Sequence, residues 1–384
     1  MKKTIYKYFF NEFVRYFIIT LFTLSVIVWT VQAVNFLDLV TEDGHAFTIY
    51  FSYSFLTLSK VLTKLIPFCF LIATVLTILK LEKDNELIVL WTSGLNKIHI
   101  VNLILRISLL VMFLQLLLTT IFNPTLLNLS RSILKNSQLE FIPSLLKEKK
   151  FNDTVEGLTI FVDKKNENNI YENIFIQDEG RILSQVATGK SDLSSAIFAK
   201  SGYVTEDDRS LVLFNGSIHK YESDENNYEK FGKVSIVKFH KTEFDLVGIS
   251  TKSISETKMQ ETSTIQILQC LQNKIKTHNC DGSKKSLMDT KIEINKRFGM
   301  PIYIPLIGLV CCFLLTSRRD TKNYFYNKYI YSFIGILILS SAEIIVRYSG
   351  MSWGHMTSYY TIPLAMIPIF YLTLIRTFKY ENLT

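Results

Sequence analysis

The sequence lacks the short motifs that mark nucleotide hydrolysis, metal binding and serine hydrolase chemistry. No Gly-x-x-x-x-Gly-Lys-Ser/Thr loop occurs, so the chain does not hydrolyse ATP by that route. Its six His residues form no His-x-x-x-His or similar ligand pair, and no Ser lies in a Gly-x-Ser-x-Gly setting. A catalytic triad dispersed along the chain would leave no such pattern. We expect a non-catalytic protein without a metal site or cofactor.

Charged residues make up only 20% of the chain, whereas 48% of its 384 residues are hydrophobic and 13% are aromatic. A soluble protein of this length rarely carries so many long apolar runs, so the class is an integral membrane protein with a polar insert. The net charge of +8 would suit nucleic acid, but the Lys and Arg residues cluster beside the apolar runs. That placement is typical of an oriented membrane protein, so no nucleic-acid partner is expected.

Six apolar runs are long enough to cross a membrane as helices, for which about 20 residues are needed. They are roughly 16–36, 61–81, 98–122, 298–317, 329–346 and 358–378. The N-terminus also resembles a secretory signal peptide, and Val31-Gln32-Ala33 resembles its cleavage site. Because the apolar run continues at full length to Phe36, we expect an uncleaved first span.

The short loops divide into those rich in Lys and Arg and those without either. Basic residues occur in the N-terminus, the 80–97 connection, the 318–328 loop and the C-terminal tail, whereas the first and last outer loops have none. Because Lys and Arg mark cytoplasmic loops, we expect both termini in the cytoplasm. We therefore predict three parts: spans one to three (1–122), an external domain (123–297) and spans four to six (298–384).

The external segment contains short apolar runs that alternate with turn signals, which predicts an all-β domain in the form of an antiparallel sandwich or open barrel. The predicted strands are 158–162, 174–176, 182–187, 196–199, 211–214 and 234–239. The turn signals include Asp178-Glu179-Gly180, Asp207-Asp208 and Asn215-Gly216. Apolar periodicity predicts flanking helices at 126–149 and 264–276.

The five cysteines fall into two groups. Cys69, Cys311 and Cys312 lie inside apolar runs, as small packing residues do. Cys270 and Cys280 lie in the external segment, with a spacing that fits no common zinc pattern. They would form a disulfide only in an oxidising compartment, and the sequence leaves that pairing open.

Two pairs of charged residues near the spans are candidate functional residues. Glu343 and Arg347, four residues apart in span five, would pair across one helical turn. Such a pair would either line a substrate path or anchor the helix at the interface. Lys60 and Lys64, at the outer end of span two, would either bind a phosphorylated lipid headgroup or anchor that span.

The 82–95 segment between spans two and three is too charged to cross a bilayer and too apolar to be a free loop. We expect a helix at the cytoplasmic surface, with Leu87, Leu90 and Trp91 on one face and Glu86 in its first turn. An acid in the first turn stabilises a helix in any case. An anionic membrane surface attracts basic residues, however, so the acid favours a protein partner with a basic rim.

This segment, Glu86-Leu87-Ile88-Val89-Leu90-Trp91-Thr92-Ser93-Gly94-Leu95, resembles the coupling helix of the lipopolysaccharide export permeases, the LptF/LptG (YjgP/YjgQ) family. The 199–216 stretch is similar to consecutive strands of that family, and Glu293-Ile294-Asn295-Lys296-Arg297 resembles its Glu-x-x-x-Arg entry to span four. The long 123–151 stretch looks more like LptF than LptG. Thr92, where members often have Ala, is a departure, as is the lack of basic residues at the outer end of span one.

The resemblance implies the permease subunit of an ABC transporter in the inner membrane of a Gram-negative bacterium. It implies an LptG-like sister permease, a dimer of a cytosolic LptB-like ATPase, and LptC-like and LptA-like periplasmic partners that receive lipopolysaccharide. The insert would be a periplasmic β-jellyroll. Glu86, Leu87, Leu90, Trp91 and Gly94 would couple the ATPase to the spans.

Two other classes of function stay open at this point. One is a force-transmitting ABC membrane subunit that acts on periplasmic proteins without moving lipid. The other is a membrane-anchored periplasmic sensor or scaffold, which would not need the coupling helix.

Overall fold

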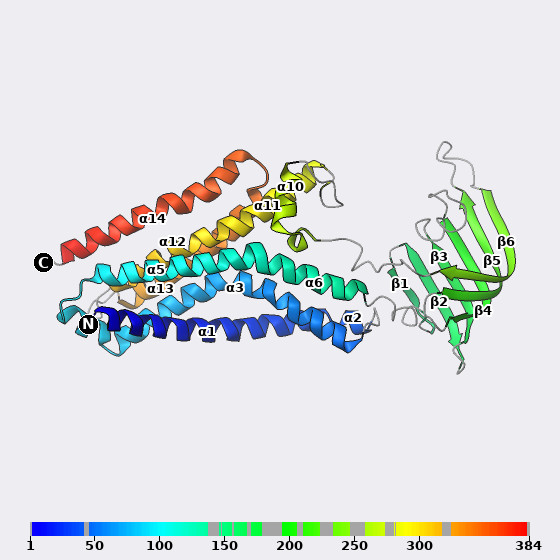
Figure 1. Cartoon of the computed structure of the whole chain (residues 1–384), viewed down its shortest axis with the longest axis horizontal. Helices are drawn as coiled ribbons and strands as arrows, with labels where there is room; N and C mark the ends of the chain where they lie inside the picture. The colour runs from blue at the N-terminus through cyan, green and yellow to red at the C-terminus, as the bar shows by residue number, and fades with distance from the viewer. Residues whose placement is uncertain are drawn as a thin grey trace. The chain divides into compact units, whose positions relative to one another are not determined.

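The computed structural model describes most of the chain. The described residues are 2–41, 46–136, 146, 148–155, 157–166, 170–178, 194–205, 210–222, 233–245, 258–272, 280, 282–316 and 324–381. They belong to two compact units: one comprises 1–31, 56–128 and 257–384, and the other comprises 32–55 and 129–256. The first unit is a helical bundle and the second contains the β-sheet (Figure 1).

The helices before the sheet are α1 (Lys2–Asn35), α2 (Asp38–Thr41), α3 (Phe47–Lys83), α4 (Glu86–Thr92), α5 (Lys97–Leu117), the π-helix η1 (Leu118–Phe122) and α6 (Asn123–Asn136). Those after it are η3 (Met259–Glu261), α10 (Thr264–Leu271), α11 (Lys284–Gly299), η4 (Met300–Ile302), α12 (Tyr303–Cys312), η5 (Phe313–Thr316), α13 (Tyr324–Tyr348) and α14 (Trp353–Glu381). In the described chain, six helical stretches are long and apolar enough to cross a membrane, which confirms the predicted number of spans.

Span four forms the centre of the bundle. All ten residues of α12 are buried, and 78% of the most apolar part of this span lies inside the protein. The corresponding share is 6% for the first span and 17% for the sixth. The chain therefore packs its helices around α12 and leaves long apolar faces of α1 and α14 uncovered.

Span three contains a π-helical turn, η1, between α5 and α6. Pro124 has no N–H to donate to the carbonyl of Thr120, so the regular helical bond cannot form there. Thr264 Oγ1 donates to the Thr120 carbonyl instead, at 2.5 Å, and Thr119 Oγ1 donates to the Arg297 carbonyl at 3.1 Å. The π-turn thus joins span three to the two helices that begin the second half of the bundle.

The β-sheet is a curved, six-stranded antiparallel meander in the order β1-β2-β3-β4-β5-β6 (Figure 1). Its strands are β1 (Phe151–Val155), β2 (Leu158–Lys165), β3 (Ile170–Asp178), β4 (Ser194–Val204), β5 (Ser210–Glu222) and β6 (Lys233–Asp245). One face carries a cluster of buried apolar side chains that includes Ile160, Ile174, Ile197 and Leu213. The inserted β domain is therefore present, whereas the jellyroll topology stays a prediction.

Two asparagines inside strands explain where the sequence reading failed. Asn173 and Asn215 have positive φ values of 51° and 49°. Side chains alternate between the two faces along each strand, and this alternation is offset by one residue after each asparagine. The predicted turn at Asn215-Gly216 is wrong, because β5 continues through it in unbroken register with β4 and β6. Gly216 is needed there, since a Cβ atom would lie 2.2 Å from the Phe198 carbonyl oxygen.

Other predictions for this segment have mixed outcomes. The structure adds β1, and the predicted strand 182–187 and the turns at 179–180 and 207–208 lie outside the described residues. The predicted helix 126–149 is wrong at its end, because α6 ends at Asn136 and Glu148 pairs with Val162 of β2. Helices α10 and α11 belong to the bundle unit.

Cys270 and Cys280 form a disulfide that joins α10 to the segment before α11, while Cys69, Cys311 and Cys312 are free and buried. We expect three cysteines of the denatured, unreduced chain to react with a maleimide polymer, and all five to react after reduction. A gel shift resolves the two adducts. Five reactive cysteines without reductant would contradict the disulfide.

Candidate functional site

Helix α4 is a short, well-terminated helix between spans two and three. Asn85 precedes it in the left-handed conformation, with a φ of 57°. At its other end Gly94 has a φ of 80°, its N–H bonds the Trp91 carbonyl at 3.0 Å, and the Leu95 N–H bonds the Leu90 carbonyl at 3.2 Å. This is a Schellman termination, in which glycine avoids the strain that a Cβ atom would meet. Gly94 therefore fixes where α4 ends.

The apolar face of α4 packs inward against the bundle core, so Leu87 does not contact a partner as expected, whereas partner contacts of Leu90 and Trp91 stay predictions. Leu87 is only 7% exposed, and Leu90 and Trp91 pack partly buried against the same core. The Lys97 ammonium also lies 5.7 Å from the centre of the Trp91 ring. The exposed apolar side chains are instead Ile88 and Val89, which sequence periodicity did not single out.

Glu86 lies in the first turn of α4, as predicted from sequence, and is partly exposed. Its Oε1 atom accepts a hydrogen bond of 2.9 Å from the hydroxyl of Tyr8 in α1. This contact could not be predicted from sequence, because the two residues are 78 positions apart. The carboxylate is thus held in place while part of its surface stays open to another molecule.

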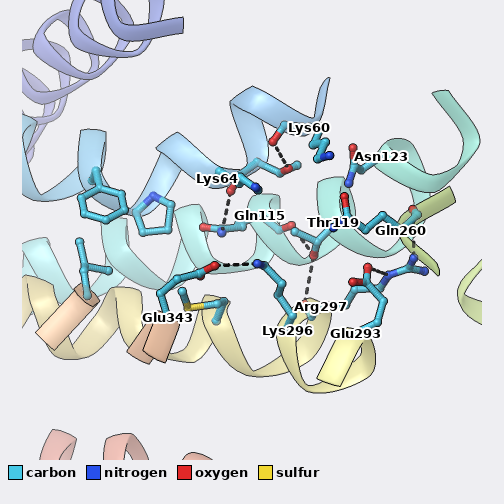
Figure 2. A pocket seen from close by; sticks show the side chains of 15 residues that line it. Lys60, Lys64, Gln115, Thr119, Asn123, Gln260, Glu293, Lys296, Arg297 and Glu343 are labelled. Carbon is cyan, nitrogen blue, oxygen red and sulfur yellow. Dashed lines mark hydrogen bonds and ion pairs between the residues drawn. The ribbon is translucent and has the colours of Figure 1, made fainter. Parts of the chain in front are cut away.

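A second site is a polar cavity of about 270 Å³ within the bundle, which Figure 2 shows from close by. Lys60 and Lys64 line it from α3, Gln115 from α5, Lys296 from α11 and Glu343 from α13. Lys64 and Lys83 lie 19 residues apart along α3, a rise of about 28 Å, close to the thickness of a bilayer core. The polar cavity and α4 are therefore near opposite ends of span two.

Arg297, which also lines the polar cavity, is fully engaged with other parts of the protein. Its Nε donates to Glu293 at 2.9 Å and its Nη1 to Thr264 at 2.8 Å. Its Nη2 donates to the carbonyls of Met259, Gln260 and Thr262 at 3.4, 3.3 and 3.0 Å. With a side chain only 3% exposed, Arg297 is a structural clamp on the segment before α10.

Glu343 pairs with Lys296, at 2.7 Å between Nζ and Oε1, rather than with Arg347 as predicted. Arg347 lies exposed on α13. A residue four positions along the same helix was the natural candidate from sequence, but the packing of α11 against α13 supplies a nearer cation. This ion pair consumes one positive and one negative charge of the polar cavity.

Two cations and a buried acceptor of the polar cavity can bind a ligand. Among the residues that the structure describes, neither Lys60 nor Lys64 forms an ion pair. Gln115 is 2% exposed, and its Nε2 donates to the Thr63 carbonyl at 3.2 Å while its Oε1 has no partner among the described residues. A buried amide oxygen without a donor is costly. The cavity can therefore hold an anionic group that also carries a hydroxyl or amide hydrogen.

Lys60 and Lys64 were predicted as candidate site residues, whereas Gln115 and Lys296 were not. A glutamine within an apolar span is itself a signal for a functional position. Lys296 was visible inside the Glu-x-x-x-Arg stretch. Over the described ranges, no group of three His, Cys, Asp or Glu side chains could hold a metal ion.

The fold and these sites define a multi-span membrane protein with an inserted β domain and a helix presented between spans two and three. The family model that matches the chain is "Lipopolysaccharide export system permease LptF/LptG", over residues 7–378. The chain belongs to this family. It is also similar to a protein of Rickettsia prowazekii (strain Madrid E), at 33% identity over 201 residues, which is 51% of this chain and 52% of that protein.

Proposed function

We propose that this chain is a non-catalytic permease subunit that moves lipopolysaccharide out of the inner membrane, using ATP hydrolysed by a separate cytosolic subunit. Family membership gives the class of transporter. The observation within the structure that supports it best is the polar cavity, where two lysines and a buried amide oxygen lie together without partners among the described residues. Membrane interiors carry such groups at substrate paths.

The chemistry of the polar cavity fits a phosphorylated sugar headgroup. The ammonium groups of Lys60 and Lys64 would bind phosphate oxygens, and Gln115 Oε1 would accept a hydrogen bond from a hydroxyl or amide group. The Lys296–Glu343 pair would border this site without adding net charge. Arg297 would not bind the lipid, because its hydrogen bonds are already made within the protein.

We expect replacement of both free lysines, Lys60→Gln with Lys64→Gln, to lower lipopolysaccharide crosslinking at the cavity about tenfold or more, since two charge-assisted bonds are lost. The readout is photocrosslinking from a probe at Phe68, which lines the same cavity. Lys328→Gln, in α13 away from the cavity, is the control. Unchanged crosslinking in the double variant would exclude the headgroup role.

Helix α4 would contact the cytosolic ATPase. Glu86 would meet a basic residue of that partner, and Ile88 and Val89 would supply the apolar contact. The opposite face of α4, formed by Leu87, Leu90 and Trp91, would fix the helix to the bundle, so that a displacement of α4 is transmitted to the spans. On this proposal both termini are cytoplasmic.

The remaining partners follow from surfaces that this chain leaves uncovered. The exposed apolar faces of α1 and α14 would pack against lipid and an LptG-like sister permease, which makes this chain the LptF-like member. The edge strands β1 and β6 would pair with LptC-like and LptA-like domains, because unpaired strand edges accept further strands. A disulfide between Cys270 and Cys280 fits a periplasmic location for that side of the bundle.

The experiment that tests the proposal is a mild-detergent pull-down of the tagged chain, followed by mass spectrometry of proteins and lipids. Recovery of an ABC ATPase, a second six-span permease and lipopolysaccharide is expected. The same complex with photocrosslinks to periplasmic proteins and none to lipid would instead indicate a force-transmitting subunit. Recovery without any ATPase would indicate a sensor or scaffold.

A further inference from the structure

Helix α1 is attached to the bundle at its N-terminal end. Phe9 and Phe13, one helical turn apart, are each 3% exposed in the bundle core, and the Phe13 ring meets the Phe70 ring edge-on at 5.6 Å. Further along α1 the side chains become open, with Phe22 69% and Val31 61% exposed. The N-terminal part of α1 is therefore anchored in the bundle core, whereas the rest of the helix exposes many apolar side chains and makes scattered contacts, such as the buried Ser25 and the bond from Tyr50 to the Ala33 carbonyl.

The held end of α1 also carries a polar stripe, Tyr8 and Glu12, which faces the region around α4. Tyr8 donates its hydroxyl hydrogen to Glu86 Oε1 at 2.9 Å, at the start of α4. Glu12 Oε2 lies 2.8 Å from Lys80 Nζ, near the end of α3. Residues four apart share a helix face, so one stripe of α1 contacts both elements.

These two contacts straddle the turn that joins α3 to α4. That turn contains Asn85 in the left-handed conformation, and the Asn85 side chain makes no capping hydrogen bond to α4. A groove of about 410 Å³ lies between α1 and α4, lined by Ile5, Phe9 and Val89 among others. Close packing therefore does not fix α4 to α1 at this point, and the two side-chain contacts connect them across the groove.

We propose that Tyr8, Glu12 and Lys80 brace the α3–α4 turn, so that a displacement of α4 moves α1. This inference rests on the proposed function, in which a cytosolic partner pushes α4. A push on α4 would then displace the N-terminal end of span one directly, whereas the buried helix α12 would not move. Tyr8, Glu12 and Lys80 are positioning residues, since none of them needs to touch the lipid or ATP.

The test is made on the full complex in lipid nanodiscs, with spin labels at Phe22→Cys on α1 and Phe113→Cys on α5, both of which are exposed positions. We expect ATP with vanadate to shift the label distance in the otherwise unchanged chain. Tyr8→Phe with Lys80→Met should abolish that shift while ATP hydrolysis continues. Lipid released per ATP should fall about fivefold to tenfold, the effect on an equilibrium of losing one hydrogen bond and one ion pair.

Two further variants separate bracing from a general loss of structure. Exchange of the charges, Glu12→Lys with Lys80→Glu, should restore the shift that either single change removes. Tyr6→Phe, which removes a neighbouring hydroxyl, should leave it intact. An undiminished shift in Tyr8→Phe with Lys80→Met would overturn the inference. A shift that depends on the brace in a complex that releases no lipid would keep the inference and overturn the proposed cargo.

Discussion

Glu86→Arg is expected to leave the protein in the membrane and to reduce ATP-dependent lipopolysaccharide release about 100-fold. The side chain is partly exposed on a surface helix, so an arginine there can keep its charge in contact with solvent. It places a cation where a basic residue of the ATPase is proposed to bind, and like charges at an interface cost several kcal/mol. The measurement is release of lipid from proteoliposomes to a periplasmic acceptor, with ATP hydrolysis followed in parallel.

Two other substitutions control for charge and for the Tyr8 bond. Asp84→Arg makes the same charge change two residues earlier, and we expect a much smaller effect. Glu86→Gln keeps an acceptor for the Tyr8 hydroxyl and should lose only part of the release. An Asp or Glu introduced at the opposing position of the ATPase should rescue Glu86→Arg. Normal release by Glu86→Arg, with the complex assembled, would exclude the role of Glu86.

The spans could be predicted from sequence because a bilayer imposes one simple requirement, a helix of about 20 apolar residues. The same reading placed Glu86 correctly at the start of α4, since the charged turn before it breaks the apolar run. Periodicity also grouped Leu87, Leu90 and Trp91 on one face. It could not tell whether that face meets a partner or the chain's own core, because both are apolar.

The failures share a physical cause, which is that the deciding contacts are distant in sequence. Asn215-Gly216 has the chemistry of a turn, yet β4 and β6 hold it in a strand. Glu343 binds Lys296 rather than Arg347 because α11 lies beside α13. Lys60 and Lys64 could be predicted because a charge in an apolar span is conspicuous. Gln115 is neutral, and its role in a site is recognised only from the cavity that it lines.

The second large effect is expected at Arg297, where substitution by Met should destabilise the bundle by about 3–5 kcal/mol. The change would leave the Glu293 carboxylate, 12% exposed, without its cation, and would leave Thr264 and the Met259, Gln260 and Thr262 carbonyls without their donor. Thermal unfolding of the purified chain in detergent should show a midpoint lower by about 4–6 °C. The midpoint of Arg297→Lys should lie between those of the unchanged chain and Arg297→Met, because Lys keeps the charge but not the planar set of donors.

Its neighbour Lys296 provides the matched control for this prediction. Lys296→Met removes a cation of the same cavity, but Lys296 and Glu343 are 28% and 37% exposed, so we expect a loss below about 1 kcal/mol. The two variants differ by one position and remove the same charge. If they shift the midpoint equally, the clamp formed by Arg297 contributes no more than an ordinary ion pair. If only Arg297→Met unfolds early, the segment from Met259 to Thr264 depends on that single side chain for its place beside span four.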